Sequence, residues 1–355
     1  MEAPVSGHTE LSTQVVVDVH EIQEELERVR WGLHDDEVEY SEAAVHAAAE
    51  ARASVLNLIT VVMDESQLEA VRKVLHGLSI TNPSRTLVLL AQQHRGGEKL
   101  EAQVSAQTRT ESGHRVTTEE VTLHAHGEVA EHLSSVVTPL LISELPVVVW
   151  WPGLPAFDSR LFHDLCDLAD RLIVDTDEGF ERKHLGRLLE VARRDQARAE
   201  IGDFNWARLV PWRHLTAQFF DMPGMLDRLA QIQGATISYG AERPAAQAWL
   251  LAGWLKSRMA TVGIQIPVDL IEDSSHDHRV ARLDVYARGS DGAARFTVRR
   301  VPGGRLCADI RIGDQELGTR TVGVPPRSPE DLLAFELTLP GHDVLFEEAL
   351  AATME

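Results

Sequence analysis

Two histidines that alternate along a predicted strand are the first residues whose types and spacing suggest chemistry. His124 and His126 form an H-x-H pattern, and alternate residues of a strand point to the same face. Two imidazoles on one face supply half of a metal site. The remaining histidines are scattered and offer no third ligand, so a surface or packed histidine pair is the favoured interpretation. We expect neither a metal nor another cofactor.

The motifs that bind phosphates or supply a nucleophile are absent from the sequence. No G-x-G-x-x-G follows the first predicted strand, and no G-x-x-x-x-G-K-[ST] occurs. No G-x-S-x-G provides the exposed serine of a hydrolase elbow. We therefore predict no catalytic residue.

The two cysteines, Cys166 and Cys307, are too few for a disulfide framework and favour a reducing compartment. Cys166 lies at helical spacing from Phe162 and is read as a small buried hydrophobe. Cys307 shares a predicted strand face with Asp309 and Arg311, so we expect an accessible thiol near a cation, which favours the thiolate. A redox site at Cys307 is one hypothesis, and an inert thiol is the other.

Arginines recur in consecutive predicted strands near the C-terminal end of the sequence. A patch of them would bind a phosphorylated ligand or an acidic partner, whereas charge balance on a solvated sheet face is the plainer explanation. The first reading predicts a sugar-phosphate- or nucleotide-binding enzyme or sensor. Its candidate phosphate ligands are Arg295, Arg299, Arg300 and Arg305, with Arg288 nearby.

Two adjacent tryptophans, Trp150 and Trp151, end a predicted buried strand and run into Pro152. Neighbouring side chains of a strand point to opposite faces, so the two indoles cannot fill the same layer. We expect one to pack under a helix and the other to reach the carboxyl-end rim, where open α/β sheets bind ligands.

A second dense segment, DFNWARLVPWRHLTAQFF, covers residues 203–220. Either of its first polar residues can cap a helix, and Pro211 should kink that helix or start a new one. Tryptophan and arginine dominate protein–protein hot spots. A partner-binding helix and a helix buried between domains are equally favoured readings. Together with the preceding W-W-P element, the candidate contact residues for a partner are Trp150, Trp151, Pro152, Asp203, Asn205, Trp206, Arg208, Trp212 and Arg213.

The elements that position these residues alternate between strand and helix over the first two hundred residues. This pattern predicts an α/β fold with a mixed, mostly parallel sheet and helices on both faces. Residues 101–109 and 114–125 alternate like half-exposed strands. The predicted buried strands are 55–63, 86–91, 146–151 and 172–175, and the helices that accompany them are 65–75, 128–142, 159–170 and 178–194.

The order of predicted elements changes near residue 200, where helices precede a run of short strands. The second half therefore reads as an α+β part with an antiparallel sheet. Its predicted helices are 205–220, 244–259 and 342–352, and its strands are 264–271, 279–287, 294–301 and 306–312. The predicted domains are an N-terminal tail and helix over 1–40, an α/β domain over 41–198 and an α+β domain over 199–355; within them, 1–14 is read as a tail and 42–52 as a helix.

Composition narrows the class of partner. The 355 residues include 34 Lys and Arg against 55 Asp and Glu, for a net charge of −21. A chain this acidic repels phosphate backbones and anionic lipids, so we expect neither nucleic acid nor membrane as a partner. The longest apolar runs fall short of the roughly 20 residues that span a bilayer, and no targeting segment is recognised. We expect a cytoplasmic protein.

Several segments resemble the OpcA family, which comprises glucose-6-phosphate dehydrogenase assembly proteins. The similar stretches are ARASVLNLITVV at 51–62, NPSRTLVLL at 82–90, LPVVVWWPGLP at 145–155, DFNWARLVPWR at 203–213 and LAGWLKSRM at 251–259. The W-W-P element and the D-x-x-W-x-R-x-x-x-W-R element are the most specific of them.

The resemblance implies an accessory protein without catalytic activity. It implies binding to glucose-6-phosphate dehydrogenase, promotion of the active oligomer and allosteric activation in the oxidative pentose phosphate pathway. In photosynthetic bacteria the family is linked to thioredoxin-dependent control, which makes thioredoxin a further candidate partner. Two cysteines distant in sequence are a poor fit to that control.

Overall fold

The computed structural model describes residues 9–16, 19–32, 54–79, 81–111, 114–177, 179–194, 199–240, 246–275, 279–289, 292–339 and 341–355. The helix predicted over 42–52 lies outside these residues. None of the described helices combines the length and apolar character needed to cross a membrane. The chain divides into two compact units, one with Met1–Val174 and Gln196–Glu200 and the other with Asp175–Asp195 and Ile201–Glu355.

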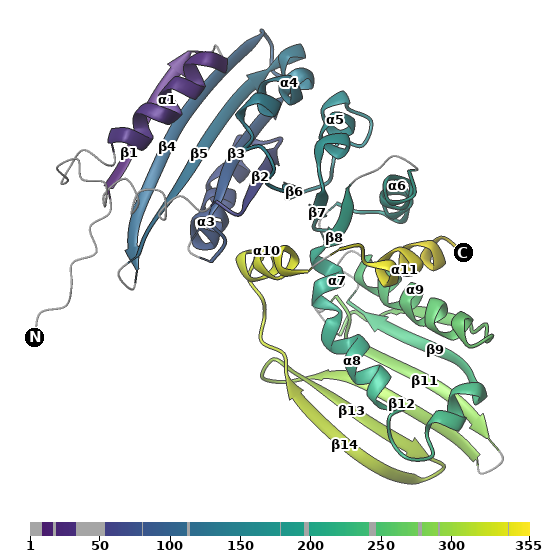
Figure 1. Cartoon of the computed structure of the whole chain (residues 1–355). Coiled ribbons are helices and arrows are strands. Elements are labelled where there is room, and N and C mark those ends of the chain that lie inside the picture. The colour runs from purple at the N-terminus through teal and green to yellow at the C-terminus, as the bar shows by residue number, and fades with distance from the viewer. Residues whose placement is uncertain are drawn as a thin grey trace, which may run out of the picture. The chain divides into compact units, whose positions relative to one another are not determined.

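A mixed sheet has the strand order β1-β4-β5-β3-β2-β6-β7-β8 (Figure 1), and all of its strands except β8 lie wholly in the first unit. Neighbours from β5 to β7 pair in parallel, and β1, β4 and β5 pair antiparallel. The strands are β1 (Thr9–Val16), β2 (Leu56–Val62), β3 (Ser84–Gln92), β4 (Lys99–Glu111), β5 (His114–His126), β6 (Val147–Trp151), β7 (Arg171–Val174) and β8 (Glu200–Asp203). The predicted α/β class is confirmed.

Helices cover the sheet because its central strands are apolar on both sides. Every residue of β2 is buried, which requires cover on both faces. Ile22 and Leu26 of the first helix are buried as well. The helical elements are α1 (Val19–Gly32), η1 (Glu65–Gln67), α3 (Leu68–Leu78), η2 (Gly127–His132), α4 (Leu133–Val137), η3 (Thr138–Leu140) and α5 (Arg160–Leu168). Residues 9–14, predicted as part of a tail, instead form most of β1, which pairs with β4.

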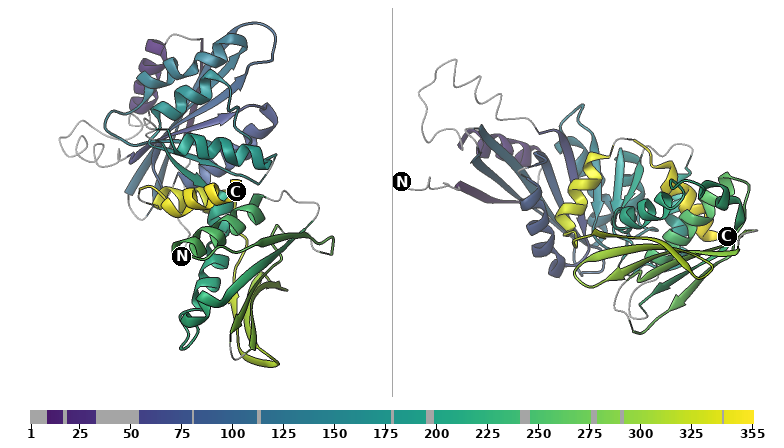
Figure 2. Two further views of the ribbon diagram at one scale, coloured as in Figure 1. Left: turned by 90° about the vertical axis from the view of Figure 1, so that its right-hand side faces the viewer. Right: turned by 90° about the horizontal axis from the view of Figure 1, so that it is seen from below.

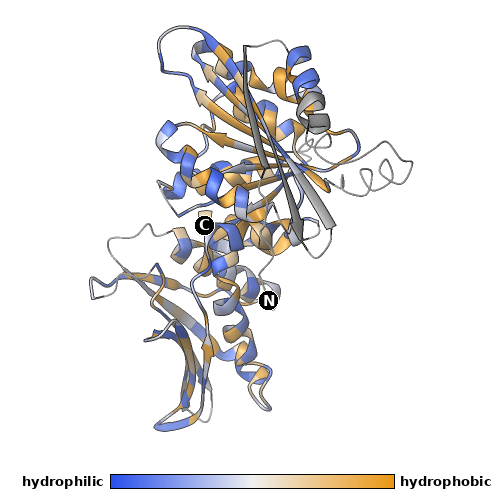
Figure 3. Cartoon of the chain, turned by 90° about the vertical axis from the view of Figure 1, so that its left-hand side faces the viewer, coloured by the Kyte–Doolittle hydropathy of each residue, from blue (hydrophilic) through white to orange (hydrophobic). Residues whose placement is uncertain are grey.

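The second unit holds a six-stranded sheet with the order β10-β9-β11-β12-β13-β14. Only β10 and β9 pair in parallel, and the other neighbours are antiparallel, as the α+β reading predicts. The strands are β9 (Ile232–Tyr239), β10 (Val268–Glu272), β11 (Arg282–Gly289), β12 (Gly292–Val301), β13 (Arg305–Ile312) and β14 (Gln315–Gly323). Hydrophobic and hydrophilic residues alternate along them (Figure 3). One face is therefore apolar and the other polar.

The apolar face packs against helices of the same unit. The rings of Phe219 and Phe220 lie 5.5 and 5.2 Å from the ring of Phe296 on β12. In Figure 2 (left), α8 lies along one side of the sheet, and no described helix lies along the other. The helical elements are α6 (Arg182–Ala192), α7 (Phe204–Arg208), α8 (Val210–Gln218), η4 (Leu226–Gln231), α9 (Ala246–Thr261), α10 (Pro329–Thr338) and α11 (Val344–Met354).

Candidate functional site

The start of the 203–220 segment is fixed by Asp203, the last residue of β8. Its carboxylate accepts hydrogen bonds from the backbone N–H groups of Asn205 at 3.2 Å and Trp206 at 3.1 Å, so it caps α7 as predicted. Pro211 lies in the first turn of α8, directly after its first residue Val210, where the missing N–H costs nothing. One expected helix is thus two short helices.

The same carboxylate reaches the loop that follows β7. Asp203 also accepts hydrogen bonds from the backbone N–H of Thr176 at 3.0 Å and from its hydroxyl at 2.9 Å. Asn205 donates from Nδ2 to the Thr176 hydroxyl at 3.2 Å. Asp203 and Thr176, which supply the accepting oxygens, are both fully buried. Asp203 therefore joins β8, α7 and the β7 loop in one polar network.

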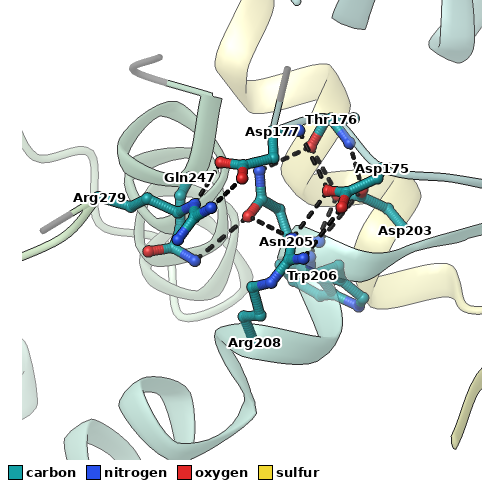
Figure 4. A network of polar contacts seen from close by, with 9 residues as sticks. All are labelled: Asp175, Thr176, Asp177, Asp203, Asn205, Trp206, Arg208, Gln247 and Arg279. Atoms are coloured by element: carbon teal, nitrogen blue, oxygen red, sulfur yellow. Dashed lines mark hydrogen bonds and ion pairs between the residues drawn. The ribbon is translucent and has the colours of Figure 1, made fainter. Parts of the chain in front are cut away.

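Further charged pairs surround this network (Figure 4). The guanidinium of Arg208 makes a two-pronged ion pair with Asp175, at 2.7 and 2.9 Å. Arg279 makes a second two-pronged pair with Asp177. Fork-on-fork pairs of this kind fix orientation as well as distance. They hold the β7 loop to α7 and to the chain that leads into β11.

Burial changes the acidity of Asp203. Desolvation, together with the neighbouring Asp175 carboxylate, raises the pKa of Asp203 to about 7, and the hydrogen bonds from Thr176 and Asn205 oppose that rise. An aspartate with such a pKa resembles a general base, and the Thr176 hydroxyl beside it resembles a nucleophile. Neither residue is exposed, so no substrate atom can reach the pair. We read the pair as structural.

The two tryptophans of the 203–220 segment, Trp206 and Trp212, also make their contacts within the second unit. Trp206 donates from Nε1 to Asp343 at 2.7 Å, and its ring lies 5.3 Å from that of Phe346. Asp343 caps α11, so Trp206 connects α7 to the last helix. The fully buried Trp212 lies under Arg300, whose guanidinium is 5.6 Å from the ring centroid.

Arg213 lies over the Trp206 ring, with its guanidinium carbon 3.5 Å from the centroid. Its Nη2 donates to the carbonyl of Trp206 at 3.2 Å. Burial lowers the pKa of Arg213 to about 10, and the nearby carboxylates of Asp343 and Glu336 counteract that fall. The arginine stays charged at neutral pH and adds a cation–π contact to the cluster.

The tryptophans of the W-W-P element are buried too. Trp150 is 2% exposed and Trp151 is 1% exposed. Trp151 contacts Phe162 of α5 edge to face, with centroids 5.6 Å apart. The prediction that one indole reaches the carboxyl-end rim is therefore wrong, because both faces of β6 are covered. Pro152 is half-buried beside them.

The proposed phosphate ligands do not converge on one site. Arg300 donates from Nε to the carbonyl of Val280 at 2.8 Å and lies on the apolar face of the sheet with Trp212. Arg299 lies on the opposite face, as the alternation of a strand requires. Arg305 donates to the carbonyl of Pro302 at 3.0 Å in the hairpin, and Arg295 lies over the ring of Tyr286.

Two properties were expected of Cys307, a nearby cation and an accessible thiol, and only the first is confirmed. Arg299 donates toward its sulfur at 3.6 Å, so a cation is close, as predicted. Cys307 is only 4% exposed, however, so the expected accessible thiol is wrong. Cys166 is buried as expected. Among the described residues, no cluster of three or more His, Cys, Asp or Glu has metal-binding geometry, and His124 and His126 lack a third ligand there.

A groove of about 740 Å³ lies in the first unit between α3 and the polar face of β4 and β5. Arg72, Lys73 and His76 line it together with Glu69, Glu119 and Glu120. Arg72 is engaged by Glu120 at 3.5 Å and by the Thr122 hydroxyl at 3.3 Å. Because both signs of charge are mixed in its walls, the groove does not favour an anion such as a sugar phosphate.

Sequence comparison places both halves of the chain in one family. Residues 75–193 match the family described as glucose-6-phosphate dehydrogenase subunit N-terminal domain, and residues 199–350 match the corresponding C-terminal domain. The chain belongs to the OpcA family. The family resemblance of the W-W-P and D-x-x-W-x-R-x-x-x-W-R elements is thereby confirmed.

Three relatives are named OpcA and described as OxPP cycle proteins. The protein of Synechocystis sp. is 31% identical over 186 residues, which cover 51% of this chain and 38% of that protein. The protein of Synechococcus elongatus is 28% identical over 305 residues, or 77% of this chain and 68% of its own length. The protein of Nostoc punctiforme is 32% identical over 185 residues. The chain thus spans well under half of the Synechocystis and Nostoc relatives, since the Nostoc match covers 39% of that protein.

Solved structures show a looser likeness. A 3-ketoreductase from Actinomadura kijaniata matches 84% of this chain and 90% of its own, with 11% identity and a TM-score of 0.41. The transcriptional regulator Gal80p of Kluyveromyces lactis matches 88% of this chain and 94% of its own, with 7% identity and a TM-score of 0.45. Superpositions this loose carry no functional argument.

Sequence reasoning missed several members of the network in this OpcA-family chain. They are Asp175, Thr176, Asp177, Gln247, Arg279 and Asp343. The available signal was the D-T-D run at the end of the strand predicted over 172–175, since polar residues at the carboxyl end of a parallel strand commonly mark a site. Their partners lie up to 137 positions away in sequence and have no local pattern.

Proposed function

We propose that this chain is a non-catalytic assembly factor that binds glucose-6-phosphate dehydrogenase and raises its activity by favouring its active oligomer. The observation that carries the proposal is the match of both halves to families described as domains of a glucose-6-phosphate dehydrogenase subunit. Three relatives are described as OxPP cycle proteins, and this description supports a role of the chain in the oxidative pentose phosphate pathway.

The arrangement of the D-x-x-W-x-R-x-x-x-W-R element supports a binding role. Asp203, Trp206, Arg208 and Arg213 use their polar atoms to hold the second unit together, and they present no reactive group to solvent. Such a segment stiffens the surface that surrounds it. The rings of Trp206 and Trp212 are buried in this unit, and those of Trp150 and Trp151 are buried in the first unit, so all four support the surface of their own unit from within and do not serve as direct contacts.

Activation of the dehydrogenase requires only differential affinity. A protein that binds the active oligomer more tightly than the inactive form shifts the equilibrium by that difference in binding free energy. Rigid surfaces suit this role, since they lose little entropy on binding. No chemical step by this chain is needed.

The test mixes the purified chain with the dehydrogenase of the same organism. We expect a complex of defined mass by light scattering, and a higher kcat/KM for glucose 6-phosphate oxidation at a saturating amount of the chain. Arg187→Ala, a change at a half-buried arginine of α6 that pairs with Glu190, should leave both readouts unchanged. A dehydrogenase whose mass and kinetics do not respond to the unmodified chain would refute the proposal.

A further inference from the structure

The polar face of the second unit's sheet concentrates arginine. Strand register places six arginines of β11, β12 and β13 on this face, whereas Arg300 points to the apolar face. We call these residues the arginine face: Arg282, Arg288, Arg295, Arg299, Arg305 and Arg311. No described helix covers it (Figure 2).

This concentration contrasts with the charge of the rest of the chain. Residues 279–312 contain eight arginines and three aspartates, although the whole chain has 34 basic and 55 acidic residues. A segment with an excess of five positive charges therefore belongs to a chain of net charge −21. Simple charge balance on a solvated face would not require such an excess.

Acidic neighbours neutralise only half of the arginine face. Arg282 pairs with Asp284, Arg299 lies 3.6 Å from Asp309, and Arg311 lies 3.6 Å from Glu316. The other three arginines form no ion pair with a described carboxylate: Arg288, Arg295 and Arg305. Three arginines of the face are thus left without a carboxylate partner among the described residues.

The surplus arginines are held in place. Arg295 is exposed, and its guanidinium lies 5.2 Å from the ring centroid of Tyr286 on the neighbouring strand. Arg305 is exposed and anchored through Nε to the Pro302 carbonyl. Beneath the long side chains, Thr297 is buried and donates to Asp284 at 2.6 Å. Arginines held this way lose little further freedom when a partner pairs with them.

We infer that the arginine face is a docking surface for a protein that presents a carboxylate-rich patch. The inference rests on the proposed function and assigns that patch to the dehydrogenase. A second copy docked face to face would bring two positive surfaces together, which disfavours a symmetric dimer through this face. A single phosphate is disfavoured as well, because the guanidinium groups spread over three strands about 4.8 Å apart and do not converge.

The test measures the affinity of the chain for immobilised dehydrogenase by interferometry at two salt concentrations. The Arg295→Glu/Arg305→Glu variant should raise Kd by roughly tenfold or more and weaken its salt dependence, since charge pairs across interfaces control both. The matched control is Arg95→Glu/Arg160→Glu, which changes net charge by the same amount at two exposed arginines of the first unit. Circular dichroism and a milder Arg295→Gln/Arg305→Gln variant separate lost binding from lost folding.

The outcomes distinguish the two proposals. If the unmodified chain binds and the face variants bind within about twofold of it, or the control pair weakens binding equally, the docking surface is wrong and the proposed function stands. If the unmodified chain does not bind the dehydrogenase, the proposed function fails and the inference fails with it. A dimer of the chain alone that the face variants abolish would also overturn the inference.

Discussion

Replacement of Asp203 by asparagine tests whether a buried acid limits stability near neutral pH. The native pKa of about 7 lies above the ordinary value of 3.8, so the carboxyl group stabilises the fold fully only below that ordinary value. The stabilisation is lost as pH rises through about 7. The complete interval corresponds to about 4 kcal/mol, of which roughly 2 to 3 kcal/mol falls between pH 5 and pH 8.

Asparagine imitates the neutral acid, because its single carbonyl oxygen can still accept from the backbone N–H of Asn205, while its Nδ2 replaces the oxygen that accepts from Trp206. We therefore expect Asp203→Asn to match the unmodified chain at pH 5 and to exceed its free energy of unfolding by about 2 to 3 kcal/mol at pH 8. A gain of that size is a large fraction of the stability of a typical domain.

The assay is urea unfolding at pH 5, 6, 7 and 8 and constant ionic strength, followed by tryptophan fluorescence. The control is Asp64→Asn in the first unit, where a backbone hydrogen bond from Ser66 lowers the pKa of an exposed capping aspartate. Stability from Asp64 is lost as pH falls, so that variant should keep the pH 5–8 slope of the unmodified chain. Equal slopes for Asp203→Asn and the unmodified chain would refute the reasoning.

Three further changes test other contacts of the second unit. Trp206→Phe keeps the ring but removes the donor to Asp343, and it should lower the free energy of unfolding by about 1 to 3 kcal/mol in urea titrations; an unchanged midpoint would contradict this bond. Gly253→Ala should lower the Tm, because the added methyl group would overlap the Ala349 carbonyl of α11. This cost should exceed the roughly 1 kcal/mol that alanine gains over glycine in a helix. A raised Tm would show that α9 and α11 can separate freely. Cys307→Ser should leave activation of the dehydrogenase unchanged with and without oxidant, since the native thiol is buried; loss of an oxidant response in the variant would restore the redox hypothesis.

The repeating pattern of strands and helices made the architecture readable from sequence. The runs at 55–63 and 146–151 became the buried strands β2 and β6, since continuous apolar stretches bounded by turns have few other solutions. β14 was missed because all of its nine residues are exposed or nearly so, which removes the alternation that marks a strand. β9 was missed because glycine and glutamine interrupt its pattern.

The candidate site was less predictable for a physical reason. The types of residue at 203–213 were identified, and Asp203 was one of the two predicted caps. A buried helix and a partner-binding helix could not be told apart, because tryptophan and arginine occur both in hot spots and in internal cation–π pairs. Only the positions of Asp343 and Arg300, which are distant in sequence, decide between the two environments for Trp206 and Trp212.

The chain crosses between its two units more than once, at 174–175, 195–196 and 200–201. A cut between the two family-matched regions, after residue 193 and before residue 199, would leave Asp175, Thr176 and Asp177 on one fragment and their partners Asp203 and Arg279 on the other. Neither half can therefore be inherited, expressed or exchanged alone without a gap in its polar interior. Recombination that exchanges one half of the chain should therefore be selected against at its middle.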